Sequence, residues 1–443
     1  MELIFPTLAG IASGVIAGLI PGIGITALMI SVGLFFVADS PLVVLAYYIG
    51  LLCASQYVGS MLAISFGLPG ESSSLPAVKE GYPLFQRGKG SLAIGTTAIS
   101  SFFGSFISMA LFFAILPVAE YLVYIWNTNM LVIIFSVAML LTFYISDNKL
   151  WVSLIMTAIG VNLGMVGINM TIGTDYLTFD QWWLYSGLPM IPVLMGCFVL
   201  PELWKAQFES KAEAKEIKFK LDVKDNFEHS RASWGVITVH SVVGFFCGLV
   251  PALTTKLASN LSYFLQKSKE VRYNNYTGPG NLKSLIAAET SNNAATFSVL
   301  LPLLFLGIPI TTSEFILYDH IQDTTTGLNL EYILNNFDIL LACFVATNVI
   351  CLALAWPMAN TCLAVYRLPA NLLKLVTVFL VLFPIIYTGL LEEQLLFYVG
   401  TFILCSVIGM IFRRYDTMPI VFVFLISREF IEGFHRFYVI NVL

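Results

Sequence analysis

Charged residues are scarce in this chain, and their scarcity excludes an ordinary water-soluble fold. Asp, Glu, Lys and Arg together make up 11% of the 443 residues, whereas 58% of the residues are hydrophobic. Soluble domains usually carry about 25% charged residues. Apolar runs longer than about 18 residues recur along the whole chain, and such runs are typical of transmembrane helices. Because every backbone polar group needs an internal partner in lipid, we expect these runs to be helical.

Signatures of catalysis and of nucleotide or metal binding are also lacking. Lys89 is followed by Gly90 rather than by Ser or Thr, so the sequence has no P-loop. Neither a His-Glu-x-x-His motif nor a Gly-x-Ser-x-Gly motif occurs. The seven cysteines stand singly, without zinc-ligand or redox spacing. We therefore expect no enzymatic activity, no cofactor, no resident metal and no nucleic-acid partner.

Two short motifs each occur twice, far apart in the chain. Residues 18–24 read GLIPGIG and recur at 248–254 as GLVPALT, whereas residues 67–74 read GLPGESSS and recur at 307–314 as GIPITTSE. Each copy sets proline and glycine inside apolar sequence, where they interrupt a helix. The apolar blocks 3–38 and 234–264 are too long for one span and contain Pro21 and Pro251. We expect each block to form two helices, as a hairpin or as half-helices that re-enter.

The placement of Lys and Arg predicts the topology. Positive residues cluster in 79–89, 205–231, 267–283 and 413–414, whereas residues 284–366 contain no Lys or Arg. Basic loops usually face the cytoplasm, so the two copies of the second motif are expected to lie in opposite orientations. We predict an all-α, polytopic membrane protein with two inverted-topology repeats. The first half would be 1–204, a cytoplasmic linker 205–231, and the second half 232–443.

Paired interrupted segments in matching halves are a pointer to the binding site of a secondary transporter. Free backbone groups at a helix break, together with hydroxyl and amide side chains, can bind an anionic substrate or a cation. Simple kinks, helix caps and interhelical hydrogen bonds are the structural alternatives, and a hairpin tip in water is the alternative for Lys256. The candidate substrate-binding residues are Gly22, Gly24, Gln56, Ser72, Ser73, Ser74, Asn292, Asn293, Thr311, Thr312 and Lys256, with sodium as a candidate near Gly22 and Asn292.

Taken in order, the motifs resemble those of the large membrane subunit (TctA-type) of the tripartite tricarboxylate transporter family. The resemblance covers roughly residues 10–315. The matching segments are 19–24 (LIPGIG), 56–60 (QYVGS), 68–74 (LPGESSS), 81–83 (GYP) with 87–89 (RGK), 187–196 (GLPMIPVLMG), and 289–294 (ETSNNA) running into 306–309 (LGIP). The chain departs from the family pattern at Ala252, Lys256 and Ile310, and these changes add bulk to the site of the second half.

The resemblance implies an inner-membrane carrier that takes up an organic carboxylate by alternating access. It also implies an ion gradient as the energy source, a periplasmic substrate-binding protein and a small membrane subunit as partners. A homodimer is one candidate assembly of the chain. A non-transporting membrane scaffold or an intramembrane enzyme is the alternative function, although an enzyme would need a clustered set of ionisable residues that the sequence does not suggest.

Overall fold

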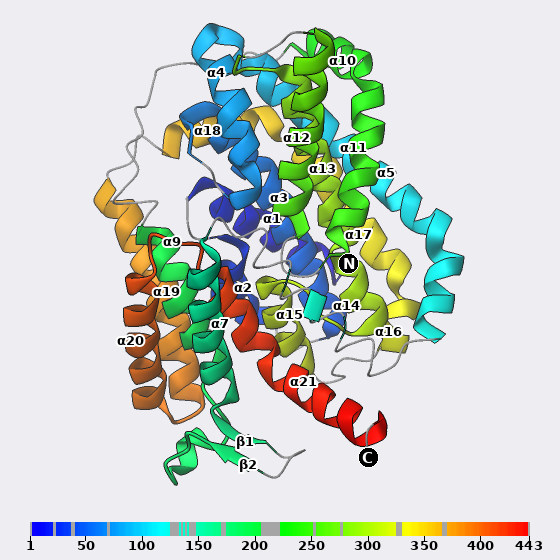
Figure 1. Ribbon diagram of the computed structural model, residues 1–443. Coiled ribbons are helices and arrows are strands. Elements are labelled where there is room, and N and C mark those ends of the chain that lie inside the picture. The colour runs from blue at the N-terminus through cyan, green and yellow to red at the C-terminus, as the bar shows by residue number, and fades with distance from the viewer. Residues whose placement is uncertain are drawn as a thin grey trace. The chain divides into compact units, whose positions relative to one another are not determined.

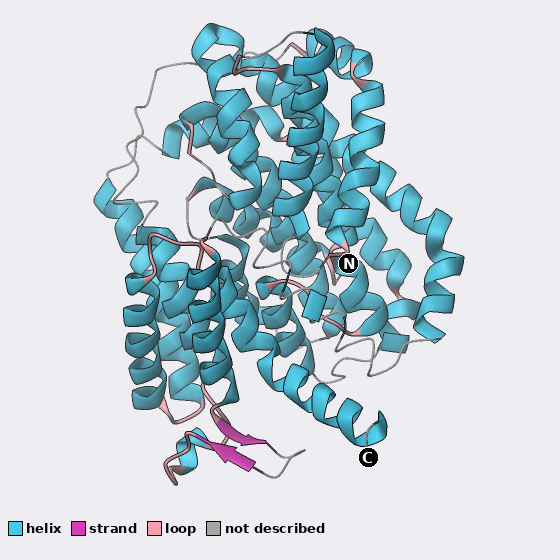
Figure 2. Ribbon diagram, viewed as in Figure 1, coloured by secondary structure: helices cyan, strands magenta, loops and turns pink. Residues whose placement is uncertain are grey.

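The protein folds almost entirely into helices (Figure 2). The computed structural model describes residues 2–20, 24–36, 40–68, 71–124, 133, 136–137, 140, 148–169, 174–204, 222–250, 254–274, 278–324, 330–365 and 370–441. The prediction of a helical protein is confirmed, with one correction. A small antiparallel sheet pairs β1 (Gly167–Asn169) with β2 (Thr174–Tyr176), placing Ile168 opposite Asp175.

Among the described residues, two helical segments are long and apolar enough to cross a membrane. They are α3 (Pro41–Phe66) and the run Ala77–Ile115. A third arises if α17 (Phe337–Ala353) and Ala355–Cys362, bent by 61°, form one span. Proline and glycine divide the apolar blocks 3–38 and 234–264, which leaves the shorter apolar helices Ile4–Leu19, Gly24–Phe36 and Trp234–Gly248.

The chain forms two compact units, and the larger one holds residues 18–24, 67–74 and 307–314, together with residues 248–250 and 254 of the remaining motif copy. It comprises Met1–Pro117, Ala206–Val250 and Thr254–Leu375. Its helices (Figure 1) are α1 (Ile4–Leu19), α2 (Gly24–Gly33), η1 (Leu34–Phe36), α3, η2 (Ser72–Ser74), η3 (Ala77–Gly81), α4 (Tyr82–Leu84), η4 (Phe85–Lys89), most of α5 (Gly90–Tyr124), α10 (Val223–Ala232), α11 (Trp234–Gly248), α12 (Thr254–Asn274), α13 (Leu282–Ser298), α14 (Leu300–Leu306), α15 (Thr312–Gln322), α16 (Leu330–Asn335), α17 and α18 (Ala355–Val365).

Both predicted breaks in the long apolar blocks are confirmed. In the first block, α1 ends at Leu19 and α2 begins at Gly24, where φ is +63°. The second ends as α11 at Gly248 and resumes as α12 at Thr254. Residues 21–23 and 251–253 lie outside the described residues, so the path of the chain between the half-helices stays a prediction.

The helix pairs before the breaks repeat each other residue by residue. A Cβ added to Gly14 of α1 would lie 2.5 Å from the Leu51 carbonyl oxygen of α3, and one added to Gly244 of α11 would lie 2.3 Å from the Ser291 carbonyl oxygen of α13. The two glycines are offset by 244 − 14 = 230 residues and the two carbonyls by 291 − 51 = 240, as the motifs are. Glycine permits this close approach of two backbones, which explains its place on both helices.

The second motif repeats just as closely. Gly67 ends α3 with φ 67° and ψ 19°, and Gly307 ends α14 with φ 70° and ψ 23°, both in the left-handed region that favours glycine. Four residues later the chain is extended at Glu71 (φ −138°, ψ 164°) and at Thr311 (φ −128°, ψ 159°), and a new helical turn begins. The two copies of this motif therefore share one backbone conformation at the described positions that can be compared.

The repeated parts exchange partners. Helix α2 from the first half packs on α15 from the second, and α12 from the second packs on η2 from the first. Likewise α17 packs on α3, whereas α5 approaches α13, where a Cβ on Gly104 would lie 2.5 Å from the Thr290 carbonyl oxygen. Reciprocal contacts of this kind are what a two-fold relation between similar parts produces.

The smaller unit comprises Val118–Lys205, Pro251–Leu253 and Val376–Leu443. Glycines again mark its tightest helix contacts: a Cβ on Gly160 of α7 would lie 2.5 Å from the Ile420 carbonyl oxygen of α21, and one on Gly196 of η6 would lie 2.7 Å from Cys405 of α20. Its helices are α7 (Leu150–Met165), η5 (Trp182–Leu184), α8 (Met190–Leu194), η6 (Met195–Val199), α9 (Leu200–Trp204), most of α19 (Ala370–Leu391), α20 (Leu395–Ile411) and α21 (Met418–Asn441).

Candidate functional site

Gln56, near the middle of α3, joins the motif copy at 67–74 to α13. Its side chain is 2% exposed. Its amide nitrogen donates to Glu71 Oε2 at 2.7 Å, and its amide oxygen accepts from Ser73 Oγ at 3.2 Å and from Asn292 Nδ2 at 2.8 Å. The structure thus brings together three of the residues predicted from sequence, Gln56, Ser73 and Asn292, and adds Glu71 to them.

A second carboxylate lies one turn from Asn292 on α13. Glu289 is fully buried and accepts a short hydrogen bond from the Ser60 hydroxyl of α3. Three buried oxygens at this crossing have no hydrogen-bond partner, namely Glu71 Oε1, Glu289 Oε1 and Asn292 Oδ1. Buried polar atoms are nearly always paired, and these three belong to residues that are linked through Gln56 and Ser60 of α3. We call Gln56, Glu71, Glu289 and Asn292 the Gln56 cluster.

The motif copy at 307–314 gathers hydroxyl groups. The Thr312 hydroxyl lies 3.2 Å from that of Thr26 on α2, and the Ser313 hydroxyl lies 2.8 Å from that of Tyr48 on α3. Glu314 caps its own helix, since its Oε2 accepts from the backbone nitrogens of Ile310 at 2.8 Å and Thr311 at 3.1 Å. Thr311 in turn accepts from the Glu314 nitrogen at 3.3 Å, which completes a capping box.

Helix α3 connects the two motifs. The copy at 67–74 is bonded to Gln56, and the copy at 307–314 is bonded to Tyr48. Eight residues of helix separate Tyr48 from Gln56 by about 12 Å. Tyr48 lies within electrostatic range of both Glu71 and Glu314. Both motif copies therefore contact the central part of α3, a 26-residue apolar helix of membrane-spanning length.

The remaining predicted residues are placed less closely. Asn293 turns to α5, where its Nδ2 donates to Ser101 Oγ at 2.8 Å, so it contributes to helix packing. Ser74 accepts from the Glu71 nitrogen at 3.2 Å and acts as a cap. Lys256 is half-buried in the first turn of α12, the helix that packs on η2, and Gly24 begins α2. Gly22 and the side chain of Ser72 lie outside the described residues.

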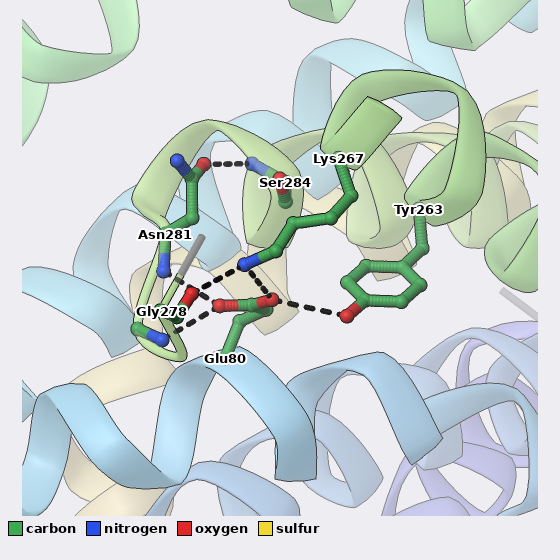
Figure 3. A network of polar contacts seen from close by, with 7 residues as sticks. Glu80, Tyr263, Lys267, Gly278, Asn281 and Ser284 are labelled. Carbon is green, nitrogen blue, oxygen red and sulfur yellow. Dashed lines mark hydrogen bonds and ion pairs between the residues drawn. The ribbon is translucent and has the colours of Figure 1, made fainter. Parts of the chain in front are cut away.

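A fully bonded carboxylate fixes the loop before α13 (Figure 3). Glu80, 1% exposed, accepts from Lys267 Nζ at 2.7 Å, from the Tyr263 hydroxyl at 3.1 Å and from the backbone nitrogens of Gly280 and Asn281 at 2.6 Å each. Lys267 Nζ also donates to the Gly278 carbonyl oxygen at 2.6 Å. This network, which we call the Glu80 clamp, ties η3 of the first half to α12 and α13 of the second.

Sequence reasoning missed the Glu80 clamp and the serines of α5. Nothing in a single sequence pairs Glu80 with Lys267, 187 residues away. A signal for α5 was present, because Ser101, Ser105 and Ser108 follow helical spacing on one face. The Ser108 hydroxyl donates to the Ala294 carbonyl oxygen at 2.7 Å, so this face serves the contact with α13. In the described part of the chain, no three His, Cys, Asp or Glu side chains gather as a metal site.

Apolar helices of membrane-spanning length, together with two similar motifs that end a helix and bear hydroxyl groups, are typical of a helical membrane protein of the transporter class. The family model of the tripartite tricarboxylate transporter TctA family matches residues 4–424, so the chain belongs to this family. The resemblance inferred from the motifs is thereby confirmed.

One curated relative extends the comparison. The chain is 28% identical over 301 residues to the "Uncharacterized 52.8 kDa protein in TAR-I ttuC' 3'region" of Agrobacterium vitis. The match covers 68% of this chain and 60% of that protein's length. No solved structure matches the chain.

Proposed function

We propose that the chain is the large membrane subunit of a secondary active transporter that takes up an organic carboxylate of the di- or tricarboxylate class. The observation that carries this proposal is the pair of helix breaks with one backbone conformation, both bonded to the middle of α3. Half-helix ends near the centre of a membrane are where transporters of this kind bind substrates. The neutral donors there are Ser73, Asn292, Thr311 and Thr312, with Ser72, Ser74, Asn293, Gly22, Gly24 and Lys256 as further candidates.

The finer features of this proposal rest on sequence and family. Basic residues follow the first copy of the second motif and none follows the second copy, which supports inverted halves 1–204 and 232–443 joined by a cytoplasmic linker at 205–231. The family supports an inner-membrane location, a periplasmic binding protein and a small membrane subunit. Alternating access driven by an ion gradient, with sodium as the candidate ion, completes the proposal. A homodimer stays one candidate assembly. The scaffold or intramembrane-enzyme alternative has no specific observation in its favour.

Uptake by proteoliposomes tests the function. We expect vesicles that contain the chain, its small subunit and its binding protein to accumulate a labelled di- or tricarboxylate under an inward sodium or proton gradient. The double variant Thr311→Val/Thr312→Val should lower uptake about tenfold or more, because buried donors to an anion are worth about 1.5–3 kcal/mol each. Thr361→Val, an exposed threonine on α18, is the matched control. The proposal is wrong if no carboxylate accumulates under either gradient.

A further inference from the structure

We propose that the Gln56 cluster binds a small monovalent cation and does not itself bind the carboxylate of the substrate. This inference rests on the proposed function and deepens it, because it divides the site at the helix breaks into a cation part and a substrate part. It moves Asn292 from the candidate substrate donors to the cation part, since Asn292 Nδ2 already donates to Gln56. The cation part would consist of Glu71 from the motif copy at 67–74, Gln56 from α3, and Glu289 and Asn292 from α13.

Charge is the first argument. Among the described residues, every group that contacts the buried carboxylates of Glu71 and Glu289 is neutral: the side chains of Ser55, Gln56 and Ser60, and backbone groups. By contrast, the buried carboxylate of Glu80 has Lys267 at 2.7 Å. Removing an unpaired carboxylate from water costs several kcal/mol, so buried carboxylates are normally paired or coordinate a cation. A substrate carboxylate placed beside these two groups would add a third charge of the same sign.

The open oxygens are the second argument. Asn292 is fully buried, and its Nδ2 is engaged by Gln56, which turns its Oδ1 away without a partner. Glu71 Oε1 and Glu289 Oε1 are likewise unpaired. Carboxylate and amide oxygens are the ligands that hard cations prefer. A single proton would satisfy one of these three acceptors, whereas a cation can contact several at once.

The motif copy at 307–314 has a different set of polar residues from the Gln56 cluster beside the copy at 67–74. The position equivalent to Glu71 is Thr311, since both begin the helical turn four residues after a left-handed glycine. The position equivalent to Asn292 is Leu52, and the position equivalent to Gln56 is Thr296, by the offset of 240 residues. The copy at 307–314 has one buried carboxylate, Glu314, whose Oε2 is bound by two backbone nitrogens of its own capping box, whereas its Oε1 has no partner. It therefore offers a single carboxylate, and neither a second carboxylate nor an amide side chain stands at the positions equivalent to Glu71, Gln56 and Asn292.

Coupling between cation and substrate follows from this arrangement. A cation in the Gln56 cluster would offset the charge of the two carboxylates and remove their repulsion of a substrate anion bound at the neighbouring hydroxyl groups. Whatever factor the cation adds to substrate affinity, the substrate must add to cation affinity. The coupling would therefore need no contact between the two ligands beyond their mutual electrostatics.

Cation binding can be measured without transport. The purified chain would be titrated with sodium chloride in a choline chloride buffer of constant ionic strength, with potassium chloride in parallel. Thermal unfolding and the binding of radioactive sodium are the readouts. We expect saturable stabilisation and binding with sodium, and no saturable effect with potassium or choline. Glu71→Gln, Glu289→Gln and Asn292→Ala should each weaken the sodium affinity about tenfold or more, which corresponds to the loss of one charged or polar contact.

Glu270→Gln is the matched control, because Glu270 is a buried carboxylate outside the cluster that is paired with Lys283. Glu71→Gln keeps the test decisive if Glu289→Gln fails to fold, since Glu71 is the less buried of the two residues. Saturable sodium binding of unchanged affinity in both glutamine variants would overturn the assignment, as would stabilisation that follows protons alone. Because no substrate or partner is needed, a failure of carboxylate uptake would leave this measurement intact, and a failure here would leave the uptake result intact.

Discussion

Glu80→Ala is expected to destabilise the protein by about 3–5 kcal/mol, the usual cost of removing one partner from a buried ion pair. The Lys267 side chain is only 18% exposed, and the substitution leaves its ammonium group without the carboxylate that pairs with it. The substitution also removes the acceptor for the Gly280 and Asn281 nitrogens. Because these nitrogens lie directly before α13, the loss should loosen the start of the helix that carries Glu289 and Asn292. Thermal unfolding of the purified chain in detergent measures the effect.

A double-mutant comparison shows whether the ion pair itself matters. Glu80→Met combined with Lys267→Met should be less destabilising than Glu80→Ala alone, because no buried charge is then left without its partner. Glu228→Ala, an exposed glutamate on α10, is the matched control and should leave the unfolding temperature unchanged. Equal stability of Glu80→Ala and the parent chain would show that the Glu80 clamp is not a stabilising contact.

Gly14→Ala and Gly244→Ala are expected to destabilise the protein by similar amounts, about 1–3 kcal/mol each, the usual cost of overpacking. In both cases the new methyl carbon would meet a backbone oxygen, at 2.5 Å and 2.3 Å respectively, and a backbone cannot move aside as a flexible side chain can. The α1–α3 and α11–α13 pairs would have to separate. Thermal unfolding and the yield of monodisperse protein measure the effect.

Gly235→Ala on α11 is the control for this pair. A Cβ at Gly235 meets no atom within 4 Å, so this change should be neutral or slightly stabilising. A large effect at Gly14 with none at Gly244 would contradict the equivalence of the two helix pairs, whatever the orientation of the halves in the membrane.

The sequence predicted the helix breaks well because proline and glycine act locally. Pro21 and Pro251 remove a backbone donor wherever they stand, and the left-handed glycines at 67 and 307 end their helices for the same local reason. The pairing of Gln56 with Asn292 was not predictable in this sense, since it depends on which helices cross. Both residues were proposed from their polarity in apolar sequence, and their direct bond emerged only from the fold.

Asn293 shows the limit of the same reasoning. Two adjacent asparagines on one helix point about 100° apart, so they cannot both serve one site. Asn292 faces Gln56 on α3, whereas Asn293 faces Ser101 on α5. Sequence alone did not say which of the two would face the broken motif. The small sheet at 167–176 was likewise missed, because strands of three residues leave no alternation to detect.

The exchange of partners between the halves has a consequence for biosynthesis. Equivalent positions of the second motif are 307 − 67 = 240 residues apart, and a ribosome adds about 5–20 residues per second. The faces of α3 and η2 that α17 and α12 cover must therefore wait for roughly 10–50 s before their partners are made. During that interval the nascent first half exposes polar groups to lipid or to insertion machinery. We expect a chain truncated after the first half to be a substrate for membrane quality-control proteases.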